Sequence, residues 1–215
     1  MYQKLFKRVI DIVLSSLGLI ILSPVFLIVI ITIKLSSKGP ILFKQKRVGK
    51  DKVLFIIYKF RTMKIDTPKD APTHLLKNPD SYITKVGKLL RKTSLDELPQ
   101  LINILKGEMS VIGPRPALWN QYDLITERDK YQANDIYPGL TGWAQINGRD
   151  ELPIQKKAAL DGVYMKKISV FFDIKCFIGT IISVMKNDGV VEGGTGKLSK
   201  SPEILNNLSE ETVSK

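Results

Sequence analysis

The hydrophobic and polar positions divide the chain into one uninterrupted apolar segment and a longer region of mixed character. Residues 12–33 read IVLSSLGLIILSPVFLIVIITI, 22 residues without a charged side chain. A straight helix of this length would be about 33 Å long, enough to cross the hydrocarbon core of a bilayer. The run is longer than the apolar core of a usual signal peptide, and no small-residue cleavage site precedes the following charges. We therefore expect a membrane segment.

Ser23 and Pro24 lie in the middle of this segment. Proline lacks an N–H donor and clashes with the preceding turn, so it predicts a bend and two arms of about 15 Å, half a bilayer each. Basic residues flank both ends: Lys4, Lys7 and Arg8 before the run, and Lys34, Lys38, Lys44, Lys46, Arg47 and Lys50 after it. Such flanks favour two ends on the cytoplasmic face and hence a re-entrant helix. A kinked spanning helix is the alternative.

Beyond residue 40 the pattern predicts a small, mainly helical globular domain of the α/β class with a short sheet. We expect a strand over 53–63, a loop over 64–81, helices over 84–92, 95–106, 117–133, 152–167 and 170–186, a stiff turn over 111–118, and a glycine-rich loop or short strand over 137–149. The predicted organisation is a membrane helix (1–38), a globular domain (39–188) and a disordered tail (189–215) rich in Gly, Ser, Asn and Glu.

Two adjacent acids, Asp96 and Glu97, stand at the start of the helix predicted over 95–106. The sequence Ser94-Leu95-Asp96-Glu97 fits a capping box, and acidic residues in a first turn complement the helix dipole. Capping and catalysis are both open explanations for the two acids. Pro99 falls just beyond the first turn and predicts a distorted helix start.

The charge balance points to an anionic partner. The formal net charge is +12 and the isoelectric point is about 9.6, which suits nucleic acid, lipid headgroups or a phosphorylated substrate. The sequence has one cysteine, Cys176, and one histidine, His74, which excludes an intrachain disulfide and a Cys/His zinc site. The chain has no helix-turn-helix, RNP-like or zinc-finger pattern, so we expect no nucleic-acid partner. A membrane-anchored basic nucleic-acid-binding or scaffold protein is the alternative.

Arg115 lies between Pro114 and Pro116, directly after Gly113. The fixed φ angles of the prolines hold a rigid guanidinium donor fork suited to an oxyanion or phosphate, although a surface arginine on a structural turn is the alternative. An aspartate beside such cations is expected to stay ionised. Ionised Asp96 could attack phosphorus or hold Mg²⁺, so the cluster favours phosphoryl chemistry on a pyrophosphate at a membrane surface.

Several stretches together resemble a known family. They are KRVIDI, the SP of the apolar run, YKFRTM, LRKTSLDELPQLINILKGEMSVIGPRP and YPGLTGWAQINGR. Over about residues 1–190 the chain resembles the bacterial sugar transferases, which are monotopic polyprenol-phosphate phosphoglycosyl transferases. The short form looks most like the enzymes that begin bacterial protein N-glycosylation from UDP-N,N′-diacetylbacillosamine.

The resemblance implies a reaction and its partners. A sugar-1-phosphate passes from a UDP-sugar to polyprenol (undecaprenyl) phosphate with release of UMP, in the first membrane step of glycan biosynthesis. The implied mechanism is ping-pong through a phosphosugar on Asp96, which also ligates Mg²⁺, with Glu97 assisting. Membrane lipids and downstream glycosyltransferases are the further implied partners. The implied location is the cytoplasmic face of the inner membrane, reached by a helix re-entrant at Ser23-Pro24.

The same resemblance assigns further site residues. The implied substrate-binding residues are Lys59, Arg91, Arg115, Arg149, Asp161 and Asp173, the last two by a looser match. Lys7, Arg8 and Asp11 match a polar cluster at the membrane edge. These roles are expectations that depend on the tertiary structure bringing the residues together.

Overall fold

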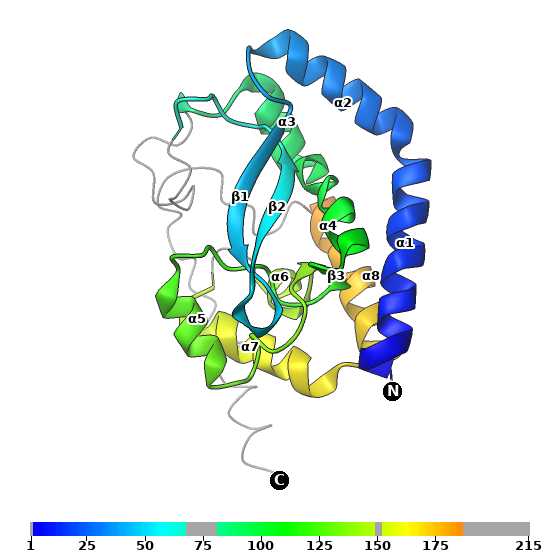
Figure 1. The fold of residues 1–215 in the computed structure, drawn as a ribbon, viewed down its shortest axis with the longest axis vertical. Helices are drawn as coiled ribbons and strands as arrows, with labels where there is room; N and C mark the ends of the chain where they lie inside the picture. Colours follow the sequence, from blue (N-terminus) through cyan, green and yellow to red (C-terminus); the bar gives the residue numbers. More distant parts are fainter. Residues whose placement is uncertain (1, 68–80, 149–151, 187–215) are drawn as a thin grey trace.

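The computed structural model describes residues 2–67, 81–148 and 152–186 (Figure 1). Arg149, His74, most of the loop predicted over 64–81 and the tail predicted over 189–215 lie outside the described residues. Within the described ranges, a long bent helical arm runs along one side of a mixed domain of short helices and two small sheets. The predicted class, mainly helical with a short sheet, is confirmed in that form.

The helical arm consists of a π-helical segment, Tyr2–Phe6, followed by α1 (Lys7–Ile21) and α2 (Ser23–Ser36). The two α-helices are bent by 61° at their junction. Pro24 lies in the first turn of α2 and cannot donate to the carbonyl of Ile20. The Ser23 hydroxyl donates to that carbonyl instead, at 2.8 Å. The predicted helix break at Ser23-Pro24 is confirmed, and this hydrogen bond explains why serine precedes the proline.

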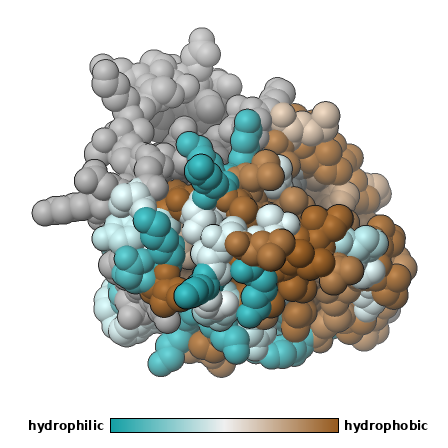
Figure 2. All heavy atoms as spheres, turned by 90° about the horizontal axis from the view of Figure 1, so that it is seen from above, coloured by the Kyte–Doolittle hydropathy of each residue, from teal (hydrophilic) through white to brown (hydrophobic). Residues whose placement is uncertain are grey.

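Among the described residues, no single helix is both long and apolar enough to cross a bilayer, whereas the bent α1–α2 pair passes that test of length and composition. The arm exposes large apolar side chains, among them Ile20, Ile21, Leu27 and Ile28. Figure 2 shows hydrophobic residues gathered on the side of the molecule along which α1 and α2 run, with hydrophilic residues toward the other side.

The arm also has faces that pack on the domain. Lys7, Asp11 and Ser15, spaced four residues apart on α1, are buried. On α2, Val29 and Ile33 pack in a cluster with Phe60. The segment predicted as a separate membrane helix is therefore in direct contact with the globular part.

The larger sheet is an antiparallel hairpin of β1 (Leu42–Val48) and β2 (Leu54–Phe60), with Leu42 opposite Phe60 and Val48 opposite Leu54. The predicted strand over 53–63 is confirmed for Leu54–Phe60. Its partner β1 was not predicted, because its sequence LFKQKRV is rich in polar and charged residues. Since side chains alternate along a strand, Lys59 lies on the same face as Phe55 and Ile57, which enter the core.

The smaller sheet pairs β3 (Ser110–Ile112) with β4 (Gly139–Thr141) in parallel. A Cβ at Gly139 would lie 2.1 Å from the backbone nitrogen of Gly113, so glycine permits this close approach. The stretch predicted over 137–149 as a loop or short strand contains β4 and the short helix α6 (Trp143–Ile146). The turn predicted over 111–118 follows β3.

The remaining helices are α3 (Lys85–Lys92), α4 (Gln100–Lys106), α5 (Tyr122–Asp129), α7 (Ile154–Lys167) and α8 (Val170–Lys186). Helices predicted over 84–92, 152–167 and 170–186 are confirmed. The helix predicted over 117–133 is shorter, because the chain near Leu118 bridges to Arg47 of β1 before α5 begins. At the other end α5 stops at Asp129, and Gln132, with φ of 56°, lies in the turn beyond it.

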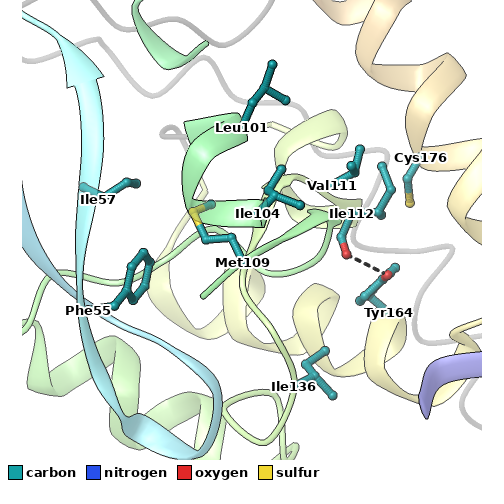
Figure 3. Close-up of a cluster of buried hydrophobic side chains, with 10 residues drawn as sticks. All are labelled: Phe55, Ile57, Leu101, Ile104, Met109, Val111, Ile112, Ile136, Tyr164 and Cys176. Atoms are coloured by element: carbon teal, nitrogen blue, oxygen red, sulfur yellow. Dashed lines mark hydrogen bonds between the residues drawn. The ribbon is translucent and has the colours of Figure 1, made fainter. Parts of the chain in front are cut away.

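The main core lies between β2, α4, β3, α7 and α8 (Figure 3). Ile57, Ile104 and Met109 are almost completely buried in it. The hydroxyl oxygen of Tyr164, on α7, lies 3.0 Å from the carbonyl oxygen of Ile112, so α7 packs directly on β3. This core sets β2 and α4 against each other, and the candidate site lies where both elements approach the turn after β3.

Candidate functional site

The backbone around Asp96 and Glu97 is not one regular helix. Ser94 has φ of 56° and ψ of 14°, residues Leu95–Glu97 form a single 3₁₀ turn, and α4 begins only at Gln100. Pro99 lacks the N–H that would continue α-helical bonding. The single helix predicted over 95–106 is therefore wrong at its start, and the distortion predicted from Pro99 is confirmed.

The capping box does not form. Ser94 is in the left-handed region, and its side chain makes no cap hydrogen bond. The Glu97 carboxylate, which a capping box would direct back to the backbone of Ser94, is directed to two cations from other elements. The capping explanation for Glu97 is therefore wrong, and its orientation is a property of the tertiary structure.

Glu97 holds Lys59 of β2 and Arg115 of the proline-rich turn together. Its Oε1 lies 2.7 Å from Lys59 Nζ and 2.8 Å from Arg115 Nη2, and Arg115 Nη1 donates to Oε2 at 3.4 Å. Burial by itself would raise the pKa of Glu97, but the charges and hydrogen bonds of Arg115 and Lys59 outweigh it and hold that pKa well below 4.5. Burial lowers the pKa of Lys59 against the opposing charge of Glu97. Glu97 is thus ionised and its orientation fixed.

Asp96 is as buried as its neighbour, at 8% and 9% exposure, but it differs in its hydrogen bonding. Among the described residues, burial and the charges of Lys59, Glu97, Arg91 and Arg115 act on its carboxylate, and none of these influences is a hydrogen bond. Burial raises the pKa of Asp96 above 3.8, Glu97 adds to that shift, and Lys59, Arg91 and Arg115 oppose it. The nearby cations therefore lower this pKa, as expected, but burial outweighs them, and Glu97 already pairs with two of them. A carboxylate with unused acceptor capacity beside cations can accept a new bond or a ligand.

Arg115 is held by the hairpin as well as by its prolines. The backbone N–H of Val48 donates to Ala117 at 2.9 Å, and Arg47 Nη1 donates to the carbonyl of Pro116 at 3.0 Å. Gln45 Oε1 accepts from Arg47 Nη2 at 2.6 Å. The turn that carries Arg115 is therefore docked on β1, and the predicted rigid arginine is supported by contacts that the sequence did not reveal.

A small, partly open pocket adjoins these groups, with room for roughly one water-sized group. It is lined by Arg47, Ile57, Lys59, Gln100, Arg115 and Pro116. The Nε2 of Gln100 is buried and has no hydrogen-bond partner within the described part of the chain. An unused donor next to three cationic side chains suits the oxygens of an anionic ligand. Sequence reasoning missed Arg47, which was counted only as a flanking basic residue, and Gln100.

The structure brings together some predicted site residues and separates others. Arg91, in the last turn of α3, lies close enough to Asp96 to lower its pKa, so it joins Lys59, Arg115 and the two acids. Arg149 lies outside the described residues. The five described residues come from β2, α3, the turn at Leu95–Glu97 and the turn after β3.

Asp161 and Asp173 have structural partners instead. The Asp161 side chain has no exposed surface and forms an ion pair with Arg128, at 2.6 Å from Nη2. Asp173 accepts from Tyr2 and Lys7, both at 2.6 Å, and from Tyr164 at 2.7 Å. Asp161 is fully enclosed, and the Asp173 side chain is only 11% exposed. These contacts give both residues structural partners, and their role in substrate binding stays a prediction.

The predicted cluster of Lys7, Arg8 and Asp11 joins α1 to the domain. Arg8 donates to the carbonyls of Ile104 and Leu105 at 2.6 and 3.0 Å, at the C-terminal end of α4. Asp11 accepts from the backbone N–H of Val111 at 2.9 Å. These residues connect the arm to α4 and β3, the two elements next to the candidate site.

The donor set limits which metal the site can hold. Within residues 2–67, 81–148 and 152–186, no group of three His, Cys, Asp or Glu side chains could hold an ion. Asp96 offers a buried carboxylate on which nearby charges act and no hydrogen bond does. Mg²⁺ typically takes one or two carboxylates and completes its shell with water and substrate phosphate. The residues present fit Mg²⁺ on those terms, with Asp96 as its protein ligand.

Comparison with known proteins places this geometry in a family. The sequence model described as "Bacterial sugar transferase" matches residues 2–187. The chain is 43% identical over 193 residues to the UDP-glucose:undecaprenyl-phosphate glucose-1-phosphate transferase of Escherichia coli K12, covering 86% of this chain and 41% of that protein. It is 40% identical over 185 residues to the uncharacterized sugar transferase EpsL of Bacillus subtilis, covering 86% and 89%.

A third relative is the exopolysaccharide production protein ExoY of Rhizobium meliloti, 35% identical over 197 residues, with 85% of this chain and 87% of that protein covered. The chain thus spans about two fifths of the first relative and nearly all of the other two. The matched region contains every described residue of the cluster around Asp96 and Glu97. This chain belongs to the bacterial sugar transferase family.

Proposed function

We propose that this chain is a phosphoglycosyl transferase that moves a sugar-1-phosphate from a UDP-sugar to undecaprenyl phosphate and releases UMP. The observation that carries the proposal is the contrast between the two adjacent acids. Glu97 is fixed by Lys59 and Arg115, whereas burial and nearby charges, and not a hydrogen bond, act on the carboxylate of Asp96 within the described part of the chain. The names of the relatives support the reaction class, since the Escherichia coli protein is named for this transfer with UDP-glucose.

In the first step, a carboxylate oxygen of Asp96 attacks the phosphorus that bears the sugar. The bond between that phosphorus and the oxygen bridging to the uridine phosphate breaks, and UMP leaves with the electron pair. In the second step, an oxygen of undecaprenyl phosphate attacks the same phosphorus. The bond between that phosphorus and the Asp96 oxygen breaks. The carboxylate is regenerated, and the product is a lipid diphosphosugar. Splitting the transfer in two lets one small site serve a water-soluble and a lipid substrate in turn.

The surrounding side chains act on phosphate charge. Arg115, Lys59 and Arg91 are placed to stabilise the negative charge that builds on the phosphoryl oxygens, and Gln100 adds a buried donor in the adjoining pocket. Glu97 keeps Lys59 and Arg115 oriented. Mg²⁺, held by Asp96 together with phosphate oxygens, would supply further charge neutralisation. Arg149 stays a predicted substrate-binding residue.

We further propose that the α1–α2 arm enters the membrane from the cytoplasmic face and returns to it. The 61° bend and the exposed apolar side chains of both helices support a half-inserted arm. Helix α8 carries further exposed apolar residues, including Phe171 and Met185. Both features suit a protein lying on the headgroup plane, where a lipid phosphate meets a cytoplasmic nucleotide sugar. Downstream glycosyltransferases, which would use the lipid product, stay predicted partners.

The test is release of UMP by the purified full chain given Mg²⁺, undecaprenyl phosphate and a panel of UDP-sugars. The panel includes UDP-glucose, because the relatives whose names specify a sugar name glucose, and UDP-N,N′-diacetylbacillosamine. We expect UMP release with at least one of them, loss of it in Asp96→Asn, and loss of it on chelation of Mg²⁺. Chelation should leave thermal stability unchanged, since the described residues offer no preformed metal cage. Absence of UMP from every sugar would refute the proposal.

A further inference from the structure

Asn103 of α4 has an unusual position for a polar residue. Its side chain is completely buried and lies against the edge of β2 that β1 does not cover. A two-stranded sheet leaves backbone N–H and C=O groups unpaired along each outer edge. At this edge a side-chain amide takes the place of a neighbouring strand.

Both N–H bonds of the Asn103 side-chain amide are used in hydrogen bonds. Its Oδ1 accepts from the backbone N–H of Tyr58 at 3.0 Å. Its Nδ2 donates to the carbonyl of Ile56 at 2.7 Å and to Glu108 Oε2 at 2.6 Å. Both contacts to β2 are to the backbone, so they fix the position of the strand along its own axis. The contact to Glu108 fixes the amide itself.

We infer that Asn103 is a positioning residue for the reaction proposed above, setting the register of β2 against α4 so that Lys59 meets Glu97 beside Asp96. The inference rests on that proposed function. Lys59 directly follows Tyr58, and its ammonium group reaches Glu97 at 2.7 Å. Because side chains alternate along a strand, a slip of one residue would turn Lys59 to the opposite face. A smaller shift would lengthen the ion pair.

The placement of Lys59 is what this contact would control. The charged groups that face Asp96 are Lys59 from β2, Glu97 beside it, Arg91 from α3 and Arg115 from the turn after β3. If β2 shifts and withdraws Lys59, the ion pair with Glu97 lengthens and the site loses one of its three cations. The contact of Asn103 should therefore affect the reaction only while Lys59 is present.

The experiment measures single-turnover UMP release from the active UDP-sugar, without lipid acceptor, in single variants and in a Lys59→Met background. The variants are Asn103→Leu, which removes all three hydrogen bonds at similar volume, and Asn103→Ala, which removes them without adding bulk. We expect the first step to slow roughly tenfold to a hundredfold, as misplaced catalytic groups typically cause. Because Asn103 would act through Lys59, we expect either Asn103 variant to slow it little further once Lys59 is replaced.

Asn134 provides a matched control. It is also buried, and its Nδ2 also bonds a backbone carbonyl and a carboxylate, Ile125 at 2.8 Å and Asp129 at 2.7 Å. Asn134→Leu should lower thermal stability and leave the rate of the first step close to that of the wild type. Glu108→Gln, whose amide oxygen can still accept from Asn103, should stay close to wild type. Hydrogen exchange should show faster exchange at the Tyr58 amide in the Asn103 variants only.

The outcomes separate the two proposals. An active wild type, together with Asn103 variants that lose stability but keep the wild-type rate of the first step, or that slow it equally with and without Lys59, would reduce Asn103 to a structural residue and overturn the inference. Unchanged exchange at Tyr58 would also overturn it. Absence of UMP release by the wild type would refute the proposed function itself and, with it, this role.

Discussion

Lys59 Nζ and Glu97 Oε1 lie 2.7 Å apart, although 38 residues separate them in the sequence. The pair joins the end of β2 to the turn before α4. Arg115, from the turn after β3, forms a second ion pair with the same oxygen of Glu97. Because this pair occupies Glu97, the neighbouring Asp96 keeps its acceptor capacity inside a positive environment. Fixing one acid thus leaves the other available for chemistry.

Asp96→Asn should abolish the reaction while stabilising the fold. We expect UMP release to fall by at least about a thousandfold, as when other nucleophiles are removed. Because the pKa of Asp96 is raised, its ionised form costs folding free energy at neutral pH, and this cost disappears as the pH falls through that pKa. The variant should therefore melt about 2–4 °C higher than wild type at neutral pH, and the difference should shrink in acid. Calorimetry across pH, with mass spectrometry for a phosphosugar on Asp96 in the wild type, provides the measurement.

Glu97→Gln should show the opposite pH dependence. The pKa of Glu97 is lowered, so its carboxylate contributes stability above its ordinary value of 4.5, and this contribution is lost as the pH falls below that value. At neutral pH the variant should lose about 2–4 kcal/mol, because Lys59 and Arg115 lose a buried charged partner. Urea unfolding at neutral and acidic pH measures this. If Glu97→Gln stayed less stable than wild type by the same amount down to strong acid, the lowered pKa of Glu97 would be contradicted.

Ser94→Gly should be tolerated or stabilising. Ser94 has a positive φ that costs about 1–2 kcal/mol for a residue with a Cβ and almost nothing for glycine. Allowing for the extra freedom of glycine in the unfolded chain, we expect a gain of up to about 1 kcal/mol. Ser94→Val, with a β-branched side chain, should lose stability. If Ser94 capped a helix, the glycine variant would instead be less stable than wild type.

Pro24→Ala should straighten the α1–α2 arm. Alanine restores the N–H that proline lacks, so the carbonyl of Ile20 regains a backbone donor in place of the Ser23 hydroxyl. In membranes we expect the two ends of the arm, accessible from one side in the wild type, to become accessible from opposite sides. Single cysteines placed at residues 4 and 38 and labelled with an impermeant reagent test this. The native Cys176 thiol should not react with the reagent, because burial raises its pKa to about 12. Unchanged labelling would show that the proline does not control the topology.

The sequence by itself determined the elements whose causes are local. The apolar run and Pro24 fixed a bent helical arm, and hydrophobic periodicity fixed α3, α7 and α8. Pro114 and Pro116 marked Arg115, and the acid pair with its surrounding motif marked Asp96 and Glu97. Each of these follows from dihedral restrictions or from the period of one stretch of chain.

Only the tertiary structure decided which groups meet. It assigned Glu97 to Lys59 and Arg115 instead of to a cap, enclosed Asp161 and Asp173 in structural ion pairs and hydrogen bonds, and brought Arg47, Gln100 and Asn103 to the site. The physical reason is that ion pairs and burial depend on distances between segments that are remote in sequence. A capping box and a long-range ion pair use the same residue types, and the packing of β2 against α4 selects the second.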